Sequence, residues 1–171
     1  MKSDRMIRVI CGMGAVVAAA YLSEPARVAL AAGDPIVVIV NSSNPVDNLS
    51  LGELKKLFLS DRDLWDTGKS VAPVMVVSGA PERTAFLKIV CGMRDADFSK
   101  YFLQAAFTGK SATPPKEVSS TAALKSFVAS SPGAIGFVKA QDFHGDGSDG
   151  GVKSVKIDGH YAADPAYRLR M

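Results

Sequence analysis

Residues 73–90 read PVMVVSGAPERTAFLKIV and combine three patterns that together indicate an α/β fold. An apolar run rich in valine, typical of a buried strand, stops at Ser78-Gly79. A helical pattern follows, with Ala80 as the expected N-cap and Pro81 as the first helical residue, where proline is favoured. Strand, small-residue turn and helix start in this order form a geometry that can hold an anion. The stretch therefore raises the question of whether its turn binds an anion or only reverses the chain.

The charges beside this turn act in opposite directions on a bound anion. Glu82 falls in the first turn of the expected helix, where its carboxylate complements the helix dipole but would repel an anion. Arg83 could instead clamp an oxyanion with two parallel hydrogen bonds. A helix start contributes roughly 0.3–1 kcal/mol to an exposed charge, whereas micromolar affinity requires about 8 kcal/mol. One turn and one arginine are too little for tight binding, so we expect a second wall to be needed.

Strand and helix patterns alternate along the rest of the chain. The run PIVVIV, Pro35–Val40, is unbroken and apolar, which favours a strand buried on both faces, as in a parallel sheet. A capping box at Ser50 and Glu53 predicts a helix that ends near Asp61. The remaining expected elements are helices from Asp95, as a cap, to Gly109 and from Ser119 or Ser120 to residue 130, strands at 71–77, 134–138 and 152–158, loops at 41–48 and 110–118, and an irregular tail at 159–171. This alternation predicts an α/β fold with a mostly parallel central sheet flanked by helices.

The first 31 residues differ in composition from the rest. Met1–Arg8 is basic, Val9–Leu22 is almost purely apolar, and Ala29–Ala31 reads ALA. A basic start, a short apolar core and an A-x-A site describe a secretory signal peptide, and the core is shorter than the roughly 20 residues of a spanning helix. We therefore expect a signal peptide at 1–31 and a single periplasmic domain at 32–171, with no membrane insertion after leader cleavage. An uncleaved N-terminal anchor is the alternative.

The charge balance of the domain does not favour binding to a polyanion. The whole chain carries a formal charge of +3, and its excess of basic residues lies largely in the expected leader. The remaining basic and acidic residues nearly balance. We therefore expect neither nucleic acid nor anionic lipid as a partner.

Motifs for nucleotide, metal or hydrolytic chemistry are incomplete. Two Gly-Lys-Ser tripeptides, starting at residues 68 and 109, lack the earlier glycine of a P-loop and have Asp63 and Gln104 there. The two histidines, His144 and His160, are not paired at a spacing typical of metal sites. No serine lies in a G-x-S-x-G elbow. We expect no cofactor and no metal, and nothing in the sequence argues for an enzyme.

Two segments resemble periplasmic phosphate-binding proteins of phosphate-import ABC transporters. The segment LSLGELKKLFLSDRDLWDTGKS is similar to that family's L-s-x-x-x-L-x-x-I-F-x-G-x-x-x-W-x-x-G pattern, and SSPGAIGFV is similar to its T-P-G-A-I-G-Y-V strand, with Phe137 in place of tyrosine. The matching residues of the first segment are Leu51, Leu54, Leu57, Phe58, Trp65 and Gly68. FTGKSATPPKEV and KIDGHYAADPAYRLR resemble short, single-domain members. The resemblance covers most of residues 35–170 and implies one lobe of a type II periplasmic binding protein, a fold in which the ligand lies between two lobes.

The family's phosphate turn reads R-S-D-G-S-G-T, and this chain departs from it. Val76 stands where the family has arginine, Ala80-Pro81 stands where it has Ser-Gly, and only Gly79 is shared. Similar groups could still come from shifted positions. The candidate anion ligands are Ser78, Gly79, Arg83 and Thr84.

Two functions follow from the resemblance and stay open at this point. The first is an exported solute-binding protein that binds phosphate or a related oxyanion and works with the membrane component of an ABC importer. The second is a periplasmic structural or interaction domain that keeps the fold and has lost the ligand. The altered turn motivates the second alternative.

Overall fold

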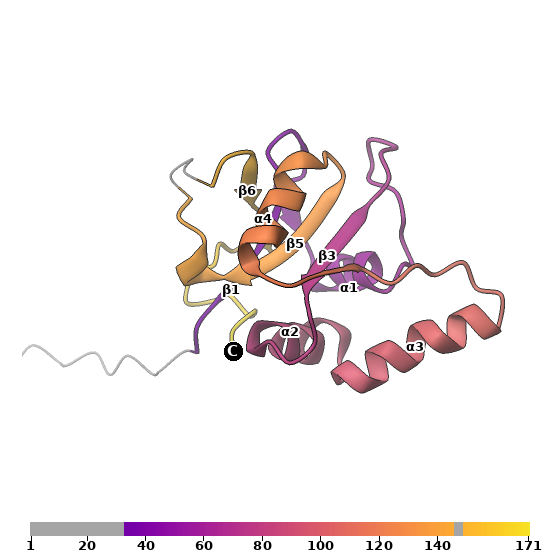
Figure 1. Cartoon of the computed structure of the whole chain (residues 1–171). Coiled ribbons are helices and arrows are strands. Elements are labelled where there is room, and N and C mark those ends of the chain that lie inside the picture. Colours follow the sequence, from indigo (N-terminus) through magenta and orange to yellow (C-terminus); the bar gives the residue numbers. More distant parts are fainter. Residues whose placement is uncertain (1–32, 146–148) are drawn as a thin grey trace, which may run out of the picture. The chain divides into compact units, whose positions relative to one another are not determined.

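The computed structural model describes residues 33–145 and 149–171, which form an α/β fold around a five-stranded sheet (Figure 1). The strands follow the order β4-β3-β5-β1-β6 across the sheet. Their bounds are Ile36–Asn41 for β1, Ala72–Val76 for β3, Lys116–Val118 for β4, Ala134–Lys139 for β5 and Val152–Ser154 for β6. A separate parallel pair joins β2, Asn48–Leu49, to β7, Lys156–Ile157. The expected signal peptide, residues 1–31, lies outside the described residues.

Four of the five strands run in the same direction, and β1 runs against them. β3 pairs in parallel with β4 and β5, whereas β1 is antiparallel to both β5 and β6. The predicted α/β fold with a mostly parallel central sheet flanked by helices is confirmed. The predicted parallel setting of Pro35–Val40 is wrong. All six residues of β1 are buried, so its unbroken apolar sequence reflects cover on both faces and carries no information on strand direction.

Two helices have the capping residues that the sequence predicts. α1 covers Leu51–Phe58, and Ser50 and Glu53 form the predicted capping box. It ends before Asp61 because Ser60, with φ of +55°, takes the left-handed conformation common after a helix end. α4 covers Thr121–Ser130, and the hydroxyl of Ser120 accepts a hydrogen bond from the backbone N–H of Ala123 at 3.2 Å.

The two helices between β3 and β4 flank the candidate turn. α2, Pro81–Phe86, starts at Pro81 as predicted and continues as a π-helical turn, Leu87–Cys91. α3, Asp95–Phe107, has Arg94 as its N-cap residue, so the prediction of Asp95 as a cap is wrong. The Asp95 side chain bonds to residues of the turn and α2 instead. No helix in the described part of the chain is long and apolar enough to cross a membrane.

Each face of the sheet has its own apolar core. On one face, α1 and α2 supply Phe58 and Phe86, which pack against Phe137 of β5. The rings of Phe86 and Phe137 stack with centroids 3.9 Å apart. On the other face, α4 packs Leu124 and Val128 against the strands. Figure 1 shows α4 on the side of the sheet away from α1 and α2.

Three segments differ from their expected structure because of contacts distant in sequence. Strand β4 forms within the expected loop 110–118, and β2 begins at the last residue of the expected loop 41–48. The expected strand 152–158 is divided into β6 and β7 by Val155, which is buried. The tail is irregular as predicted, but it packs against β1: Tyr167 is buried, and the backbone N–H of Ile36 donates to the carbonyl of Leu169 at 2.9 Å.

Candidate anion site

The candidate turn lies at the carboxyl end of β3, between that strand and α2. The backbone N–H of Val77 donates to the carbonyl of Val118 at 3.0 Å, which extends the pairing of β3 with β4 up to the turn. Gly79 has φ of +94°, a conformation that side chains rarely adopt, and it redirects the chain into the Ala80 N-cap. The strand–turn–helix geometry expected from residues 73–90 is therefore present.

Arg83 carries a buried positive charge beside the turn. Its side chain is 2% exposed, and its guanidinium lies behind the turn. Nη1 donates to the carbonyl of Val76 at 2.8 Å and to Oε1 of Glu117 on β4 at 2.7 Å. Nε donates to Oδ1 of Asp95 on α3 at 2.6 Å. One guanidinium thus joins β3, β4 and α3, and two carboxylates face its positive charge.

Ser78 and Arg83 converge on the same carboxylate. The hydroxyl of Ser78 donates to Oδ2 of Asp95, while Nε of Arg83 donates to Oδ1. Asp95 is 27% exposed, so this carboxylate lies at the surface and the arginine lies beneath it. The two donors are placed to bind two oxygens of one oxyanion. The carboxylate of Asp95 already occupies this position.

The other two predicted ligands do not contact this carboxylate. Gly79 is exposed and contributes backbone only. The hydroxyl of Thr84 is exposed and donates to the carbonyl of Ala80, one helical turn back, at 3.3 Å. The structure therefore brings Ser78 and Arg83 together, and leaves Thr84 on the outer surface of α2.

A buried carboxylate adds negative charge to the start of α2. Glu82 is 6% exposed, and its Oε2 has no hydrogen-bond partner within residues 33–145 and 149–171. This oxygen lies 3.4 Å from Nζ of Lys139 at the end of β5, close enough for an ion pair. The first turn of α2 thus complements its own dipole with Glu82, as the sequence predicts.

Asp95, Glu117 and Lys139 were missed as site residues by sequence reasoning. Asp95 is an acidic residue just before a helical pattern, and this position predicted a helix cap rather than a partner of Arg83. Glu117 lay in an expected loop, 34 positions from Arg83. No pattern within a short window reports such a pair, because the parallel pairing of β3 and β4 creates it.

The described residues contain no group of three or more His, Cys, Asp or Glu side chains that could hold a metal ion. Nδ1 of His144 lies 3.7 Å from Asp149, and Nδ1 of His160 lies 2.8 Å from Asp164. Each histidine therefore has a single carboxylate neighbour in the part of the chain that the structure describes.

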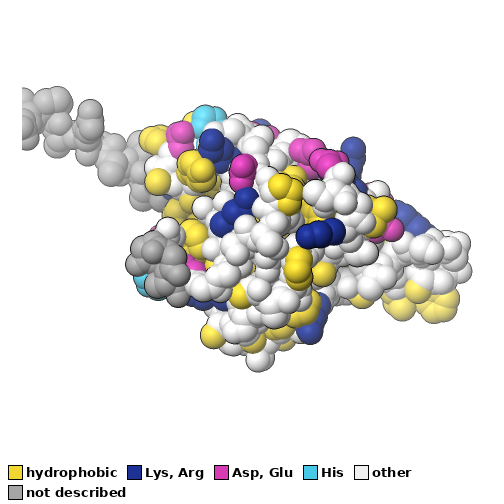
Figure 2. Space-filling model, turned by 90° about the horizontal axis from the view of Figure 1, so that it is seen from above, with side chains coloured by type: hydrophobic (Ala, Val, Ile, Leu, Met, Phe, Trp, Pro, Cys, Tyr) yellow, Lys and Arg dark blue, Asp and Glu magenta, His cyan; other side chains and the backbone are white. Residues whose placement is uncertain are grey.

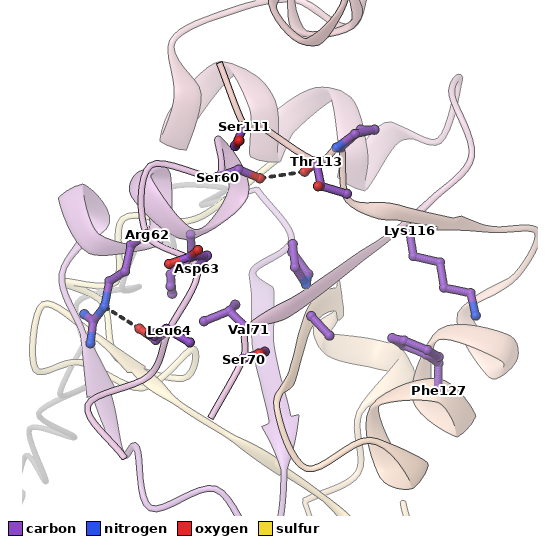
Figure 3. A pocket seen from close by; sticks show the side chains of 14 residues that line it. Ser60, Arg62, Asp63, Leu64, Ser70, Val71, Ser111, Thr113, Lys116 and Phe127 are labelled. Atoms are coloured by element: carbon purple, nitrogen blue, oxygen red, sulfur yellow. Dashed lines mark hydrogen bonds between the residues drawn. The ribbon is translucent and has the colours of Figure 1, made fainter. Parts of the chain in front are cut away.

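A separate hollow of about 440 Å³ lies at the amino end of β3, away from the turn (Figure 3). The hydroxyl of Ser60 donates across it to the carbonyl of Thr113 at 2.5 Å. Arg62 points to the carbonyl of Leu64 and pairs with Asp66. Asp63 and Lys116 also line the hollow, so charges of both signs border it.

Comparison with known proteins identifies the fold. No protein-family model matches the sequence. A protein of Clostridium perfringens, described as a phosphate ABC transporter substrate-binding protein and solved with bound phosphate, aligns with a TM-score of 0.63 over 81% of this chain and 53% of its own, at 23% identity. The chain has the fold of these phosphate-binding proteins. An ABC-type phosphate transport receptor from Vibrio cholerae gives a TM-score of 0.61 at 18% identity and is covered over 49% of its length by 77% of this chain.

The lobe predicted from the sequence is present. PstS from Borrelia burgdorferi also aligns with a TM-score of 0.61, at 11% identity, over 76% of this chain and 49% of its own. The chain thus spans about half the length of the phosphate-binding proteins that it matches. This agrees with the expectation of one lobe of a type II periplasmic binding protein.

Proposed function

We propose that this chain is an exported solute-binding protein that takes up phosphate or a related oxyanion at the Ser78–Thr84 turn and serves an ABC importer. The observation that carries the proposal is the fold, which aligns over 81% of the chain with a substrate-binding protein solved with phosphate. Periplasmic location and a membrane component of the importer as partner belong to the same proposal. N-terminal sequencing of the exported protein would test the leader.

The geometry of the turn supports an oxyanion ligand of this shape. Ser78 Oγ and Arg83 Nε already hold the two oxygens of the Asp95 carboxylate. Two oxygens of phosphate can take the same donors when Asp95 rotates away, and the exposed backbone of Gly79 is next to them. Thr84 joins if its hydroxyl leaves the carbonyl of Ala80. The proposed ligands are therefore Ser78, Gly79, Arg83 and Thr84.

Competition with Asp95 limits the affinity of the isolated domain. A carboxylate tethered beside its donors acts at a high effective concentration, and an external anion must displace it. Glu82 and Glu117 add further negative charge. We infer weak binding by this chain alone, in the millimolar range, and tighter binding only where a second copy or a partner closes the other side of the site.

Calorimetry on the domain with phosphate and sulfate tests the proposal. Asp95→Ala frees both donors and should tighten phosphate binding by about tenfold, the equivalent of roughly 1.4 kcal/mol. Asp97→Ala, which removes an exposed acid of the same helix that pairs with Arg94, should leave the affinity unchanged. Thermal unfolding shows that each variant is folded. Absence of heat from all three proteins at millimolar phosphate would contradict the proposal.

The ion pairs of Arg83 also favour a second candidate function. Asp95 and Glu117 satisfy the arginine without any ligand, as expected of a periplasmic structural or interaction domain that has lost solute binding. The same titration separates the two candidates. If Asp95→Ala binds phosphate and the natural protein does not, the donors of Ser78 and Arg83 are present but blocked by Asp95. The second candidate is then the better description.

A further inference from the structure

A second cavity, of about 410 Å³, lies between α3 and the segment that leads into β4. Phe98, Phe102 and Leu103 line it on the side of the helix, and Pro114 and Pro115 line it on the other. The apolar lining continues onto the open surface of α3, where Leu103 is 59% exposed and where Figure 2 shows apolar side chains. The size of the cavity falls in the range of small-molecule sites.

The charged side chains at one end of this cavity belong to a cluster of three, of which only two line the cavity. Arg83 and Glu117 both line it. Arg83 is balanced by Asp95 and Glu117 together, which leaves one negative charge over the three side chains. Glu117 is 51% exposed and accepts a hydrogen bond from Arg83 at Oε1, while its Oε2 has no hydrogen-bond partner among the described residues. A carboxylate oxygen is therefore open at the edge of an apolar cavity.

The nearest lysine in sequence does not neutralise this carboxylate. Lys116 precedes Glu117 on β4, and consecutive strand residues point to opposite faces of a sheet. Nζ of Lys116 lies 4.2 Å from the centroid of the Phe127 ring, in the hollow on the other side of β4. Lys116 therefore does not pair with Glu117 on the face of β4 that borders the cavity.

We propose that this cavity binds a small organic cation, a primary ammonium on an aromatic or branched apolar body. The ammonium pairs with the open oxygen of Glu117, where the net charge of the three side chains is negative. The apolar body fills the space between α3 and the two prolines. Phe98 and Phe102, whose ring centroids lie 5.0 Å apart, line the cavity and offer aromatic contacts to that body. Arg83 borders both sites, but the contact of the ammonium with Glu117 does not require phosphate at the turn.

Titration with three matched probes tests the site on the full chain. The probes are 2-phenylethylammonium, 2-phenylethanol with the same body and no charge, and phenylacetate with the opposite charge. We expect the ammonium to bind about tenfold tighter than the alcohol and phenylacetate to bind more weakly than both. Amide shift changes in an NMR titration should fall within residues 98–106 and 112–117. Equal affinities for the ammonium and the alcohol, or shift changes elsewhere, would overturn the proposal.

Two variants separate the charge from the apolar contact. Glu117→Gln keeps an acceptor for Arg83 and should reduce the affinity for the ammonium to that for the alcohol. Leu103→Ser changes an exposed lining residue and should weaken the binding of the ammonium and of the alcohol by a similar factor. Asp66→Asn, at an 89% exposed acid away from the cavity, is the control and should change neither. An unchanged ammonium affinity in folded Glu117→Gln would exclude Glu117 as the partner.

Discussion

Nε of Arg83 lies 2.6 Å from Oδ1 of Asp95, and this ion pair links α2 to the first residue of α3. The arginine is buried, whereas both of its carboxylate partners reach the surface. Such a pair has two consequences. It holds the helices beside the turn in place, and it sets the competition that any external oxyanion must overcome.

Arg83→Ala should destabilise the domain strongly. The change leaves the carbonyl of Val76 without its side-chain donor and removes the positive charge between Asp95 and Glu117. Removing one partner of a buried pair typically costs about 3–5 kcal/mol, and the partial exposure of the two carboxylates reduces this to about 2–4 kcal/mol. Urea denaturation measures the free energy of unfolding.

A second ion pair in the same segment provides the control for Arg83. Arg94 is 86% exposed and pairs with Asp97 at 3.0 Å. Arg94→Ala should change the free energy of unfolding by less than about 1 kcal/mol, as is typical of surface pairs. If Arg83→Ala and Arg94→Ala lowered the free energy of unfolding by similar amounts, the assignment of Arg83 as a structural link would be contradicted.

Local patterns in the sequence predicted the features that depend on neighbouring residues. Ser50 and Glu53 form their capping box, and Pro81 begins α2. In each case the signal and the contact lie within one helical turn, so a short window contains both. The same holds for Ser78 and Gly79, which form the turn that their position between strand and helix indicates.

The features that sequence reasoning missed depend on pairs that only the fold brings together. Glu117 meets Arg83 across the β3–β4 pairing, and the direction of β1 is set by its neighbours in the sheet. Asp95 had two possible uses, as a helix cap or as a partner of Arg83. An arginine that is nearly fully buried costs more to leave unpaired than a helix start costs to leave uncapped, and this difference explains the outcome.

Gly133→Ala should destabilise the domain because the glycine of the SPGAIG motif has no room for a side chain. An added Cβ would lie 2.0 Å from the carbonyl oxygen of Ser70, a backbone atom that cannot move aside cheaply. The carbonyl of Gly133 also accepts a hydrogen bond from Nε1 of Trp65 at 2.9 Å. Overpacking of this kind costs about 1–3 kcal/mol, measured by thermal or urea unfolding.

Gly52→Ala is the matched change in the same protein, and we expect it to stabilise the domain, whereas Gly133→Ala destabilises it. Gly52 lies in α1, and the nearest atom to an added Cβ is Oγ of Ser50 at 3.9 Å. Alanine there lowers the conformational entropy of the unfolded chain and should stabilise by about 0.5 kcal/mol. If both glycine variants destabilise equally, steric exclusion at Gly133 is not the cause.

Tyr167→Phe should weaken the attachment of the tail to β1. The hydroxyl of Tyr167 donates to the carbonyl of Ile36 at 2.6 Å, and both groups are buried. Loss of a buried hydrogen bond with its acceptor left unpaired costs about 1–2 kcal/mol. Tyr161→Phe, at a half-exposed tyrosine, should change stability by less than about 0.5 kcal/mol.

Burial also raises the pKa of the Tyr167 phenol. An absorbance titration of the folded domain should therefore show that Tyr167 stays protonated at alkaline pH until the protein unfolds. Tyr167→Phe should remove that late-titrating group. A late-titrating tyrosine that persists in Tyr167→Phe would contradict this assignment.

Asp149 makes part of the domain's stability depend on pH in the acidic range. Its side chain is 4% exposed. Burial alone would raise its pKa, but the ammonium of Lys125 at 2.7 Å and the backbone N–H of His144 at 2.8 Å outweigh burial and lower the pKa from 3.8 to about 2. The carboxylate is thus held in its charged form in the folded state.

The sign of the effect follows from this lowered pKa. A carboxyl group that binds its proton less readily in the folded state contributes stability above the unfolded pKa, and that contribution is lost as pH falls from about 4 toward 2. Asp149→Asn should therefore be less stable than the natural protein by about 1–2 kcal/mol at pH 7, a value that allows for the partial exposure of Lys125. The difference should shrink below pH 4. Urea unfolding of both proteins at pH 7, 5, 4, 3 and 2 measures it, with Asp66→Asn as an exposed control. A difference that stays constant down to pH 2 would show that Asp149 stabilises the domain by packing or hydrogen bonding alone and not through its charge.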